Sequence, residues 1–321
     1  MKRQFSDPTK SMIHIDTALS EIAIAYKPSG FIGEQVFPEV PVDKQSDKFY
    51  IWTKGFWMRN AVERRTPGDT YPEGRLQLSN DSYYCDLYHL AFPIPDEDRA
   101  NADPGVELEI AGAEWLKTQF MLNREIKLAS VAFATGSWAT YKTGGTDFTR
   151  WDDYDNSDPI TDLNTGMQTV QKSTGQRPNT LVLGKEVFDI LAEHPNLLEK
   201  FKYTSVGILD VEQVRKALRV DKLVVGEAAY ETTAEGAASA SQSYIWGKHA
   251  LLMYVPAKPG NRVPAAGYTF AWKIDGAGGL TVPIENIRED NRDRDLLKGK
   301  HAFDDKVTGS DLGYFFYTAT S

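Results

Sequence analysis

Histidines, clustered aspartates and a single cysteine are the residues of this chain that could carry chemistry. The five histidines are far apart in the sequence, and none has the spacing of an HExxH helix or of another short metal-binding motif. They are His14, His89, His194, His249 and His301. Histidines isolated in this way are typical of structural or surface positions, so they predict no metal site.

Four aspartates within residues 151–159, WDDYDNSDP, raise the question of a calcium loop. An EF-hand loop needs a glycine at its sixth position and a glutamate at its twelfth, and both are missing. Asp158 followed by Pro159 is instead typical of a helix N-cap and first turn. We therefore expect a helix over residues 160–173 in place of a calcium site.

Motifs of the large enzyme classes are missing from the sequence. There is no GxSxG elbow, no P-loop and no GxGxxG fingerprint. The nearest glycine-rich stretch, residues 275–279, leads into a strand pattern, so it lacks the helix start whose amides bind phosphate. Carboxylates are numerous, but the sequence singles out no acid–base pair. We predict no catalytic, cofactor-binding or metal-binding residues and no cofactor.

Composition indicates a globular protein of a reducing compartment. Of the 321 residues, 41% are hydrophobic and 25% are charged, which is typical of folded domains. The net charge of −9 disfavours direct nucleic-acid binding, which normally needs a basic face. The lone Cys85 cannot form an intrachain disulfide and is expected to fill space in a strand. Because the chain has neither a signal-peptide core nor a run of 18 apolar residues, we expect a soluble protein made in the cytoplasm.

The longest predicted element is a helix over residues 103–134. Asp103 is its expected N-cap and Pro104 lies in its first turn. Apolar residues recur at helical spacing, and the row expected to face the core is Leu108, Gly112, Trp115, Leu122, Ile126, Ala129 and Phe133. Roughly 30 residues make a rod of about 45 Å, which is long for a compact domain.

The first third of the chain consists of an arm and a hairpin. Residues 1–47 have only short apolar patches interrupted by proline and glycine, so we expect an arm that wraps its own domain or lies across another subunit. Residues 48–92 predict a β-hairpin with turn residues at 67–69. A two-stranded ribbon is marginally stable alone. The arginines near its tip either lie on a solvated loop or contact an acidic neighbour.

The rest of the chain predicts a compact α/β region. Its expected helices cover residues 185–195 and 210–220, the second capped by Asp210. Its expected strands cover residues 179–184, 222–231, 243–255 and 267–274. Residues 232–243 are small and polar, which indicates a loop tip. The tail has strand patterns around residues 280–287 and 313–319, with a charged run, residues 288–306, between them.

This order of parts resembles the major capsid protein family of tailed bacteriophages. Three stretches are similar to family members: ALSEIAIAYKPSGFIGEQVFPEVPVDKQSDKFYIW (residues 18–52), TGQRPNTLVLGKEVFDILAEHPNLLEKFKYT (residues 174–204) and VDKLVVGEAAYET (residues 220–232). The likeness covers most of the chain, although none of the stretches is a catalytic signature. The resemblance implies a structural, non-enzymatic protein that self-assembles into hexamers and pentamers of an icosahedral or elongated head around double-stranded DNA.

The fold that the resemblance implies is α+β, the phage major-capsid fold. Its parts are an N-terminal arm (residues 1–47), an extended β-hairpin called the E-loop (48–92), a peripheral domain (93–173) with a long spine helix (103–134), an axial α/β domain (174–272) and a return to the peripheral domain (273–321). Candidates for contact between subunits are Arg59, Arg64, Arg65, Arg75, Glu107, Glu109, Glu114, Trp52, Phe56 and Trp57. The arginines are expected to meet the glutamates of a neighbour.

The resemblance also implies partners and a location. The expected partners are further copies of the chain, a portal, a decoration protein and a separate scaffolding protein. The scaffolding protein is expected because residues 1–47 leave no room for the long scaffolding segment of some family members. The implied location is the virion, after assembly in the host cytoplasm, without a membrane and without sequence-specific DNA binding. Two alternatives stay open: a tail or head-joining protein, and an intracellular α/β enzyme with an extended insertion.

Overall fold

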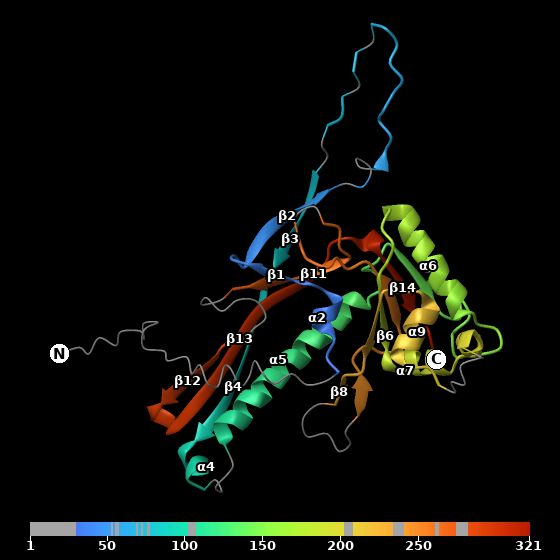
Figure 1. Ribbon diagram of the computed structural model, residues 1–321. Helices are drawn as coiled ribbons and strands as arrows, with labels where there is room; N and C mark the ends of the chain where they lie inside the picture. Colours follow the sequence, from blue (N-terminus) through green and yellow to red (C-terminus); the bar gives the residue numbers. More distant parts are fainter. Residues whose placement is uncertain are drawn as a thin grey trace.

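Two five-stranded sheets and one long helix organise the computed structural model of the protein (Figure 1). The structure describes residues 30–321 except 53, 55–57, 69, 72, 76–77, 102–106, 202–207, 234–240, 261–262 and 274–281. The first sheet has the strand order β1-β11-β13-β12, with β4 paired to the opposite edge of β13; the second has the order β5-β14-β10-β6-β7. The pairs β2–β3 and β8–β9 form separate two-stranded ribbons.

The elements have the following bounds. The strands are β1 (Glu39–Val42), β2 (Ser46–Trp52), β3 (Leu78–Tyr84), β4 (Asp86–Pro95), β5 (Thr140–Thr143), β6 (Thr180–Gly184), β7 (Lys222–Gly226), β8 (Ala229–Glu231), β9 (Gln242–Tyr244), β10 (Ala250–Met253), β11 (Gly267–Trp272), β12 (Ile284–Glu289), β13 (Arg294–Val307) and β14 (Gly313–Tyr317). The helices are α2 (Gly33–Val36), α4 (Asp96–Asn101), α5 (Leu108–Ala132), α6 (Pro159–Thr174), α7 (Lys185–Glu193), α8 (Pro195–Leu198), α9 (Val211–Leu218), η2 (Glu199–Phe201), η3 (Asp290–Arg292) and η4 (Ser310–Leu312). Among these helices, none combines the length and the apolar character that a membrane span requires.

The first sheet is built around β13, which pairs antiparallel with β4, β11 and β12. Helix α5 lies along one face of this sheet (Figure 1) and buries Leu116 and Phe120 against it. Two glycines allow the close approach. A Cβ on Gly112 would lie 2.6 Å from Phe92, and a Cβ on Gly299 would lie 2.4 Å from Phe120. The glycine that interrupts the helical pattern is therefore a packing requirement.

The predicted long helix exists, but its start was wrong. Helix α5 begins at Leu108 with Glu107 at the N-cap position, so Asp103 is not the N-cap; Asp103 and Pro104 lie outside the described residues. The helix ends at Ala132, whose carbonyl accepts a hydrogen bond from Trp138 Nε1 at 2.7 Å. This bond satisfies one of the carbonyl groups that a helix C-terminus leaves without a partner.

The predicted core row of the helix is partly wrong as well. Trp115 is 42% exposed, whereas Leu116, Phe120 and Leu128 are buried. The buried row is therefore shifted from the predicted one, and it includes Arg124 and Glu125, as well as Gly112 and Ala129 of the predicted row. A hydrophobic pattern skips such polar residues, because it assumes that charged side chains face solvent.

Helix α5 also joins the two sheets. Its C-terminal half, with Leu128, Ala129 and Ala132, packs against Val182 and Phe315 on one face of the second sheet. Helices α6, α7 and α9 form one core cluster with strands of the same sheet. In Figure 1 these helices lie at the right, beyond the second sheet, and α5 runs from that region towards the lower left.

The second sheet confirms the predicted α/β region. Strand β6 leads directly into α7, and β6 pairs in parallel with β7. Both predicted caps are present: Asp158 Oδ1 accepts from Thr161 N at 3.2 Å, and Asp210 Oδ1 accepts from Gln213 N at 2.7 Å. The Gln213 side chain returns a hydrogen bond to Asp210 N at 3.0 Å, which completes a capping box at α9.

Replacing Asp210 with alanine should lower the free energy of unfolding by about 1 kcal/mol, because Gln213 N at the start of α9 loses its acceptor. Urea unfolding followed by circular dichroism measures the change. Asp210→Asn is the matched control and should keep most of the stability, since its amide oxygen can still accept from Gln213 N. Equal losses in the two variants would contradict a capping role.

Three strand predictions need correction. Residues 222–231 form two strands, β7 and β8, and β8 leaves the sheet to pair with β9. Residues 243–255 are not one strand either, because β9 ends at Tyr244 and β10 begins at Ala250. The charged run at residues 288–306 was left without an element, yet most of it is β13, the central strand of the first sheet. Alternate residues of β13 face α5 or the opposite side of the sheet, so neighbouring charged and apolar residues serve different faces.

The predicted hairpin is confirmed for β2 and β3, which pair antiparallel from Ser46↔Tyr84 to Trp52↔Leu78. We use "hairpin" below for residues 46–84. The second predicted flank was too long, because residues 86–95 leave the ribbon and pair with β13 as β4. Cys85, between β3 and β4, is buried as expected, and its burial raises the pKa of the thiol to about 11.

The described part of the arm, from residue 30, is held by its own body. Ile32, Val36 and Phe37 are buried, and β1 extends the first sheet alongside β11. A single buried carboxylate fixes this segment: Glu125 of α5 accepts from Ile32 N and Gly33 N, both at 2.8 Å, and from Trp246 Nε1 at 2.6 Å. Glu125 therefore ties the arm, α5 and the loop before β10 together.

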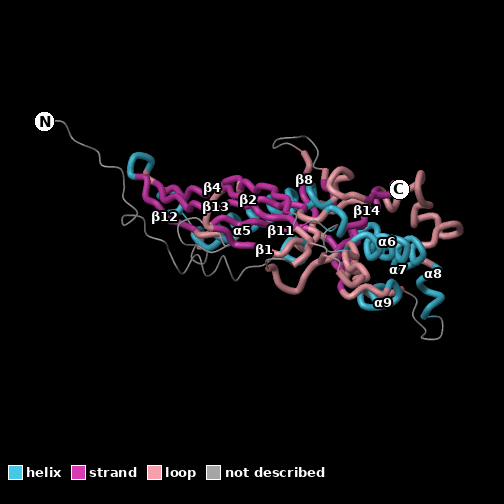
Figure 2. Tube along the Cα trace, turned by 90° about the horizontal axis from the view of Figure 1, so that it is seen from above, coloured by secondary structure: helices cyan, strands magenta, loops and turns pink. Residues whose placement is uncertain are grey.

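One uninterrupted piece of chain passes from the first sheet to the second. Strand β13 ends at Val307, η4 follows, and β14 begins at Gly313 as the second strand of the second sheet, next to the edge strand β5 (Figure 2). The short connection leaves little freedom between the two sheets.

Candidate functional site

A serine–histidine pair beside α6 is the first arrangement to test for catalysis. Ser157 Oγ lies 3.0 Å from His194 Nε2. The other ring nitrogen, Nδ1, accepts a hydrogen bond from Asn196 N at 3.2 Å, so Nε2 carries the proton and donates it to the serine oxygen. A histidine in this tautomer is not a base for that serine. Both side chains are buried, and burial lowers the pKa of His194, so the pair is structural.

The other buried histidines are also placed for packing. His301 stands between Phe120, Phe303 and Tyr88, and its burial lowers its pKa to about 3. His249 Nδ1 accepts from Thr318 N at 2.9 Å, and burial lowers the pKa of His249 to about 4. Both rings are therefore neutral at pH 7.

Metal and phosphate sites find no support in the described residues. Across the described ranges there is no group of three or more histidine, cysteine, aspartate or glutamate side chains that could hold a metal ion. Of the four clustered aspartates, Asp158 caps α6 and Asp153 accepts hydrogen bonds from Asn156. The glycine-rich stretch at residues 275–279 lies outside the described residues.

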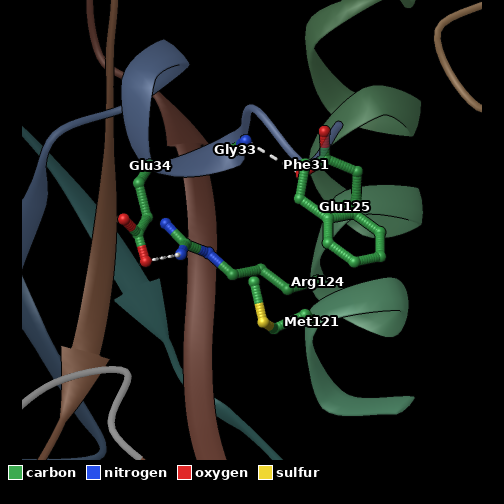
Figure 3. A pocket seen from close by; sticks show the side chains of 6 residues that line it. All are labelled: Phe31, Gly33, Glu34, Met121, Arg124 and Glu125. Carbon is green, nitrogen blue, oxygen red and sulfur yellow. Dashed lines mark hydrogen bonds and ion pairs between the residues drawn. The ribbon is translucent and has the colours of Figure 1, made fainter. Parts of the chain in front are cut away.

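A small cavity lies where the arm meets α5 (Figure 3). It has a volume of about 20 Å³, which is room for a single water molecule and far below the size of a substrate pocket. Its lining consists of Phe31, Gly33, Glu34, Met121, Arg124 and Glu125. Arg124 reaches across it towards Glu34 at 3.7 Å, so the cavity belongs to the packing of the arm.

The hairpin exposes large apolar side chains that a soluble monomer would normally bury. Figure 1 shows it projecting well beyond the two sheets. Phe49 and Tyr83 face inward onto Phe270, with ring centroids 5.3 and 4.6 Å away. Because side chains alternate along a strand, the outward face carries Tyr50, which is 71% exposed. The other exposed apolar residues of the hairpin are Met58, Val62, Tyr71, Leu78 and Tyr84.

The aromatic residues predicted for subunit contact are only partly described. Trp52 is the last residue of β2, and Phe56 and Trp57 lie outside the described residues. The sequence reasoning missed Tyr50, Leu78 and Tyr84. Their signal was the alternation within residues 46–52 and 78–84, which becomes informative once it is known which face of the hairpin meets Phe270.

The predicted arginines lie on the part of the hairpin far from the sheets. Arg59, Arg64, Arg65 and Arg75 are all exposed. Arg65 Nη1 donates to Tyr71 Oη at 2.9 Å, and its guanidinium lies 4.8 Å from the centre of that ring. The structure thus brings these residues into one projecting region that makes little contact with the rest of the chain.

The predicted glutamates lie around the start of α5. Glu107 is exposed at the N-cap position of α5, and Glu114 is half-buried about two turns into this helix. Glu109 already has a partner in its own chain, because its carboxylate accepts from Arg99 Nη2 at 2.8 Å. Arg99 also bonds Asp295, so Glu109 belongs to a charged cluster at the end of the first sheet.

Comparisons with known proteins agree with this geometry. The sequence matches the family described as Phage major capsid protein E over residues 144–266. It is 28% identical to the Major capsid protein of Burkholderia phage BcepMu, over 94% of this chain and 95% of that protein. A phage-related protein from Bordetella bronchiseptica RB50 is similar with a TM-score of 0.74 at 25% identity, covering 96% of this chain and 98% of that one. The mature capsid of bacteriophage PhiM1 is similar with a TM-score of 0.57 at 12% identity, covering 99% and 91%.

The two sheets joined by a long helix, together with the projecting hairpin, give the chain the α+β fold of the phage capsid structures to which it is similar. The chain is therefore similar to phage major capsid proteins along nearly its whole length, at 26–28% identity to two of them. Both of these relatives are named Major capsid protein, and the matched family is one of structural capsid proteins.

Proposed function

We propose that copies of this chain form the hexamers and pentamers of a closed icosahedral or elongated head that encloses double-stranded DNA. This proposal rests on the outward face of the hairpin, where Tyr50, Leu78 and Tyr84 are exposed. Covering such a surface stabilises the complex by about 25 cal/mol per Å² of apolar area removed from water. A neighbouring copy supplies this cover, and the contact repeats at every subunit.

The domain assignment follows the family pattern. In this proposal the E-loop is the hairpin, the peripheral domain is the first sheet with α5, and the axial domain is the second sheet with α6, α7 and α9. The ribbon β8–β9 carries the loop at residues 232–243, most of which lies outside the described residues. We assign this loop to the centre of each hexamer and pentamer, where small polar residues suit a crowded axis.

Subunit contact in this proposal combines apolar cover with charge. Trp52, Phe56 and Trp57 are the candidates for apolar contact. Arg59, Arg64, Arg65 and Arg75 meet carboxylates of the neighbour, with Glu107, Glu109 and Glu114 as the candidates. Exposed ion pairs contribute only about 0–1 kcal/mol each, so the apolar contacts supply most of the stability and the charges supply register.

The further partners are a separate scaffolding protein, a portal and a decoration protein, with assembly in the host cytoplasm and no catalytic step. The net charge of −9 suits a container whose wall must not adhere to the enclosed DNA. Negative-stain microscopy of the purified chain, with and without co-expressed phage proteins, tests the assignment. Closed particles are expected. Rings or tubes would instead indicate a tail or head-joining protein. A small oligomer that converts a substrate would indicate an enzyme.

Replacing both Tyr50 and Leu78 with aspartate should abolish closed particles and leave a folded, soluble chain. The two side chains are outward, so their replacement removes apolar contact area between copies without opening the core. Sedimentation velocity measures assembly, and circular dichroism checks folding. Tyr141→Asp, at another exposed tyrosine remote from the hairpin, is the control. Particle yields equal to those of the unmodified chain would remove the hairpin from the interface.

A further inference from the structure

We propose that the free edge of β4 binds an extended segment of another protein, in which acidic and apolar residues alternate, as an added strand of the first sheet. This partner is not a copy of the chain, so the site lies outside the contacts proposed for the shell. Three features meet at β4: an open strand edge, a groove with lysines on one face of the sheet, and an exposed indole on the other face.

One edge of β4 is paired and the other is open. The strand pairs with β13 along its whole length, from Phe303↔Asp86 to Arg294↔Pro95, and no strand of the described part of the chain pairs with its other edge. An open edge of this length is a template for pairing with another chain, and charged residues or proline commonly protect such edges. Residues 87–92, LYHLAF, contain no proline and no aspartate, glutamate, lysine or arginine. This part of the edge is therefore competent to accept a strand.

Two prolines show which backbone groups face the open edge. Pro93 and Pro95 both lie within the part of β4 that pairs with β13. Because proline has no N–H, it occupies strand positions whose N–H would point away from the partner strand. The direction of the backbone groups alternates along a strand, so the N–H and C=O groups of Leu87, His89 and Ala91 also point away from β13. The open edge thus offers three donors and three acceptors to an incoming strand.

A groove with two lysines lies beside this edge. Its volume is about 380 Å³, which is within the range of binding sites for small ligands and side chains. Lys300 lies 3.6 Å from Glu285, whereas Lys298 has no ion pair with any residue that the structure describes. Two lysines against one glutamate make the groove cationic in a chain whose net charge is −9. The groove is lined by His89, Leu90, Ala91, Glu285, Lys298, Gly299 and Lys300, which belong to β4, β12 and β13.

The lysines are within reach of a strand added to β4. Gly299 faces α5, so Lys298 and Lys300 point to the opposite face of the sheet. Lys298 is paired with Ala91, and Lys300 is paired with His89. An added strand lies about 4.8 Å beyond β4. An acidic side chain of that strand opposite Ala91 can therefore extend over the small alanine to the ammonium group of Lys298.

An exposed indole lies beside the other face of β4. Helix α5 runs along this face (Figure 1), and the ring of its Trp115 lies 5.6 Å from the ring of Phe92. Trp115 is 42% exposed, so an apolar side chain of an added strand would remove aromatic area from water. Successive side chains of a strand point to opposite faces. The segment that fits both faces therefore has acidic residues at alternate positions, towards the lysines, and apolar residues between them, towards Trp115.

Peptide binding to the purified full-length chain tests the site. By fluorescence anisotropy, the labelled heptapeptide TEVEVET should bind at least about tenfold more tightly than its scrambled form TEEEVVT or the cationic TKVKVKT, because only the first has both the alternation and the negative charge. Lys298→Glu with Lys300→Glu should weaken binding of TEVEVET at least about tenfold. Lys172→Glu with Lys258→Glu, an equal charge change at exposed lysines elsewhere, should leave binding unchanged.

Ala91→Pro tests strand addition separately from charge. It removes one outward N–H and leaves the pairing with β13 intact, so the variant should fold, as judged by circular dichroism, and should bind TEVEVET at least about tenfold more weakly. Ala91→Ser is the matched control and should bind like the unmodified chain. In residue-resolved hydrogen exchange, the amides of Leu87, His89 and Ala91 should exchange rapidly in the free chain and slow down on peptide binding. The amides of Tyr88 and Leu90, which point to β13, should be protected in both states.

Three results would overturn the proposed site. They are equal affinity for TEVEVET and TEEEVVT, unchanged affinity in the Lys298/Lys300 or Ala91→Pro variant, and no slowing of exchange at the outward amides. Protection of these amides without peptide, increasing with protein concentration, would mean that another copy occupies the edge, which also contradicts the proposal. None of these measurements requires closed particles, so the binding site and the proposed shell can fail independently of each other.

Discussion

Glu125→Ala should lower the free energy of unfolding by about 3–5 kcal/mol. The substitution leaves the amides of Ile32 and Gly33 and the indole of Trp246 buried without their acceptor, and each such group costs about 1–3 kcal/mol. Because the three donors come from the arm and from the loop before β10, the arm should also detach from α5. The effect is large for a single exchange because one carboxylate serves three donors.

Urea unfolding of the unassembled chain gives the loss of stability, and amide hydrogen exchange at Ile32 and Gly33 reports detachment of the arm. Glu199→Ala is the control, since Glu199 is exposed and its loss should change stability by less than about 0.5 kcal/mol. If Glu125→Ala matched Glu199→Ala in both measurements, Glu125 would not be the clamp of the arm.

The second large effect is a loss of stability in acid that comes from buried histidines. Burial lowers the pKa of His301 to about 3 and that of His249 to about 4, while the unfolded chain binds a proton on each near pH 6.5. Their contribution to stability is complete above pH 6.5 and is lost as pH falls towards the folded pKa values. At pH 5 the loss from His301 alone is about 2 kcal/mol.

Asp305 acts in the opposite direction. Its burial raises its pKa to about 6, so between about pH 6 and pH 4 the folded chain binds a proton that the unfolded chain does not, and this gains stability on acidification. Two histidines outweigh one aspartate, so we expect the free energy of unfolding to fall by roughly 2–3 kcal/mol from pH 7 to pH 5.

His301→Leu tests the assignment. Leucine has a similar volume and does not titrate, so the difference in unfolding free energy between pH 7 and pH 5 should shrink by about 2 kcal/mol relative to the unmodified chain. His89→Gln, at an exposed histidine, should leave the pH profile unchanged. A His301→Leu profile with the original slope would show that another group controls the acid response.

Local patterns in the sequence predicted those parts of the fold whose physics is local. Strand β6 and helix α7, the caps at Asp158 and Asp210, and the ribbon β2–β3 all follow from short-range signals: a buried apolar run, an acidic residue that accepts from backbone amides, and an aromatic, β-branched run near a proline–glycine turn. The interactions behind each of these signals are made between residues that are close in the sequence. Tertiary contacts therefore did not override the predicted structure.

The parts that sequence reasoning missed depend on distant partners. Strand β13 is rich in charge, and its role is visible only once β4, β11 and β12 lie beside it. Arg124 and Glu125 broke the apolar row of α5, yet they are buried because the arm and Trp246 supply partners from far along the chain. The sequence pattern of residues 86–95 continues that of the hairpin, although these residues pair with β13. The alternation of side chains along a strand does not indicate which strand it pairs with.

The residues of the candidate site also fall into those that local sequence predicts and those that depend on distant partners. The exposure of the hairpin arginines could be predicted from their turn-rich surroundings, and the structure describes them as exposed. Tyr50 could not be assigned to the outward face without the position of Phe270, which follows it by more than two hundred residues. Glu109 was predicted as a contact for another copy, but Arg99 and Asp295 of its own chain already surround it.

The passage of β13 into β14 has a mechanical consequence. A load that pulls the two sheets apart is carried as tension along this backbone, through covalent bonds, in addition to the packing of α5 against both sheets. To yield, β13 would have to shear ten registered pairs with β4 at once. A shell built from such subunits deforms little within each subunit, so deformation under load is confined to the interfaces between copies.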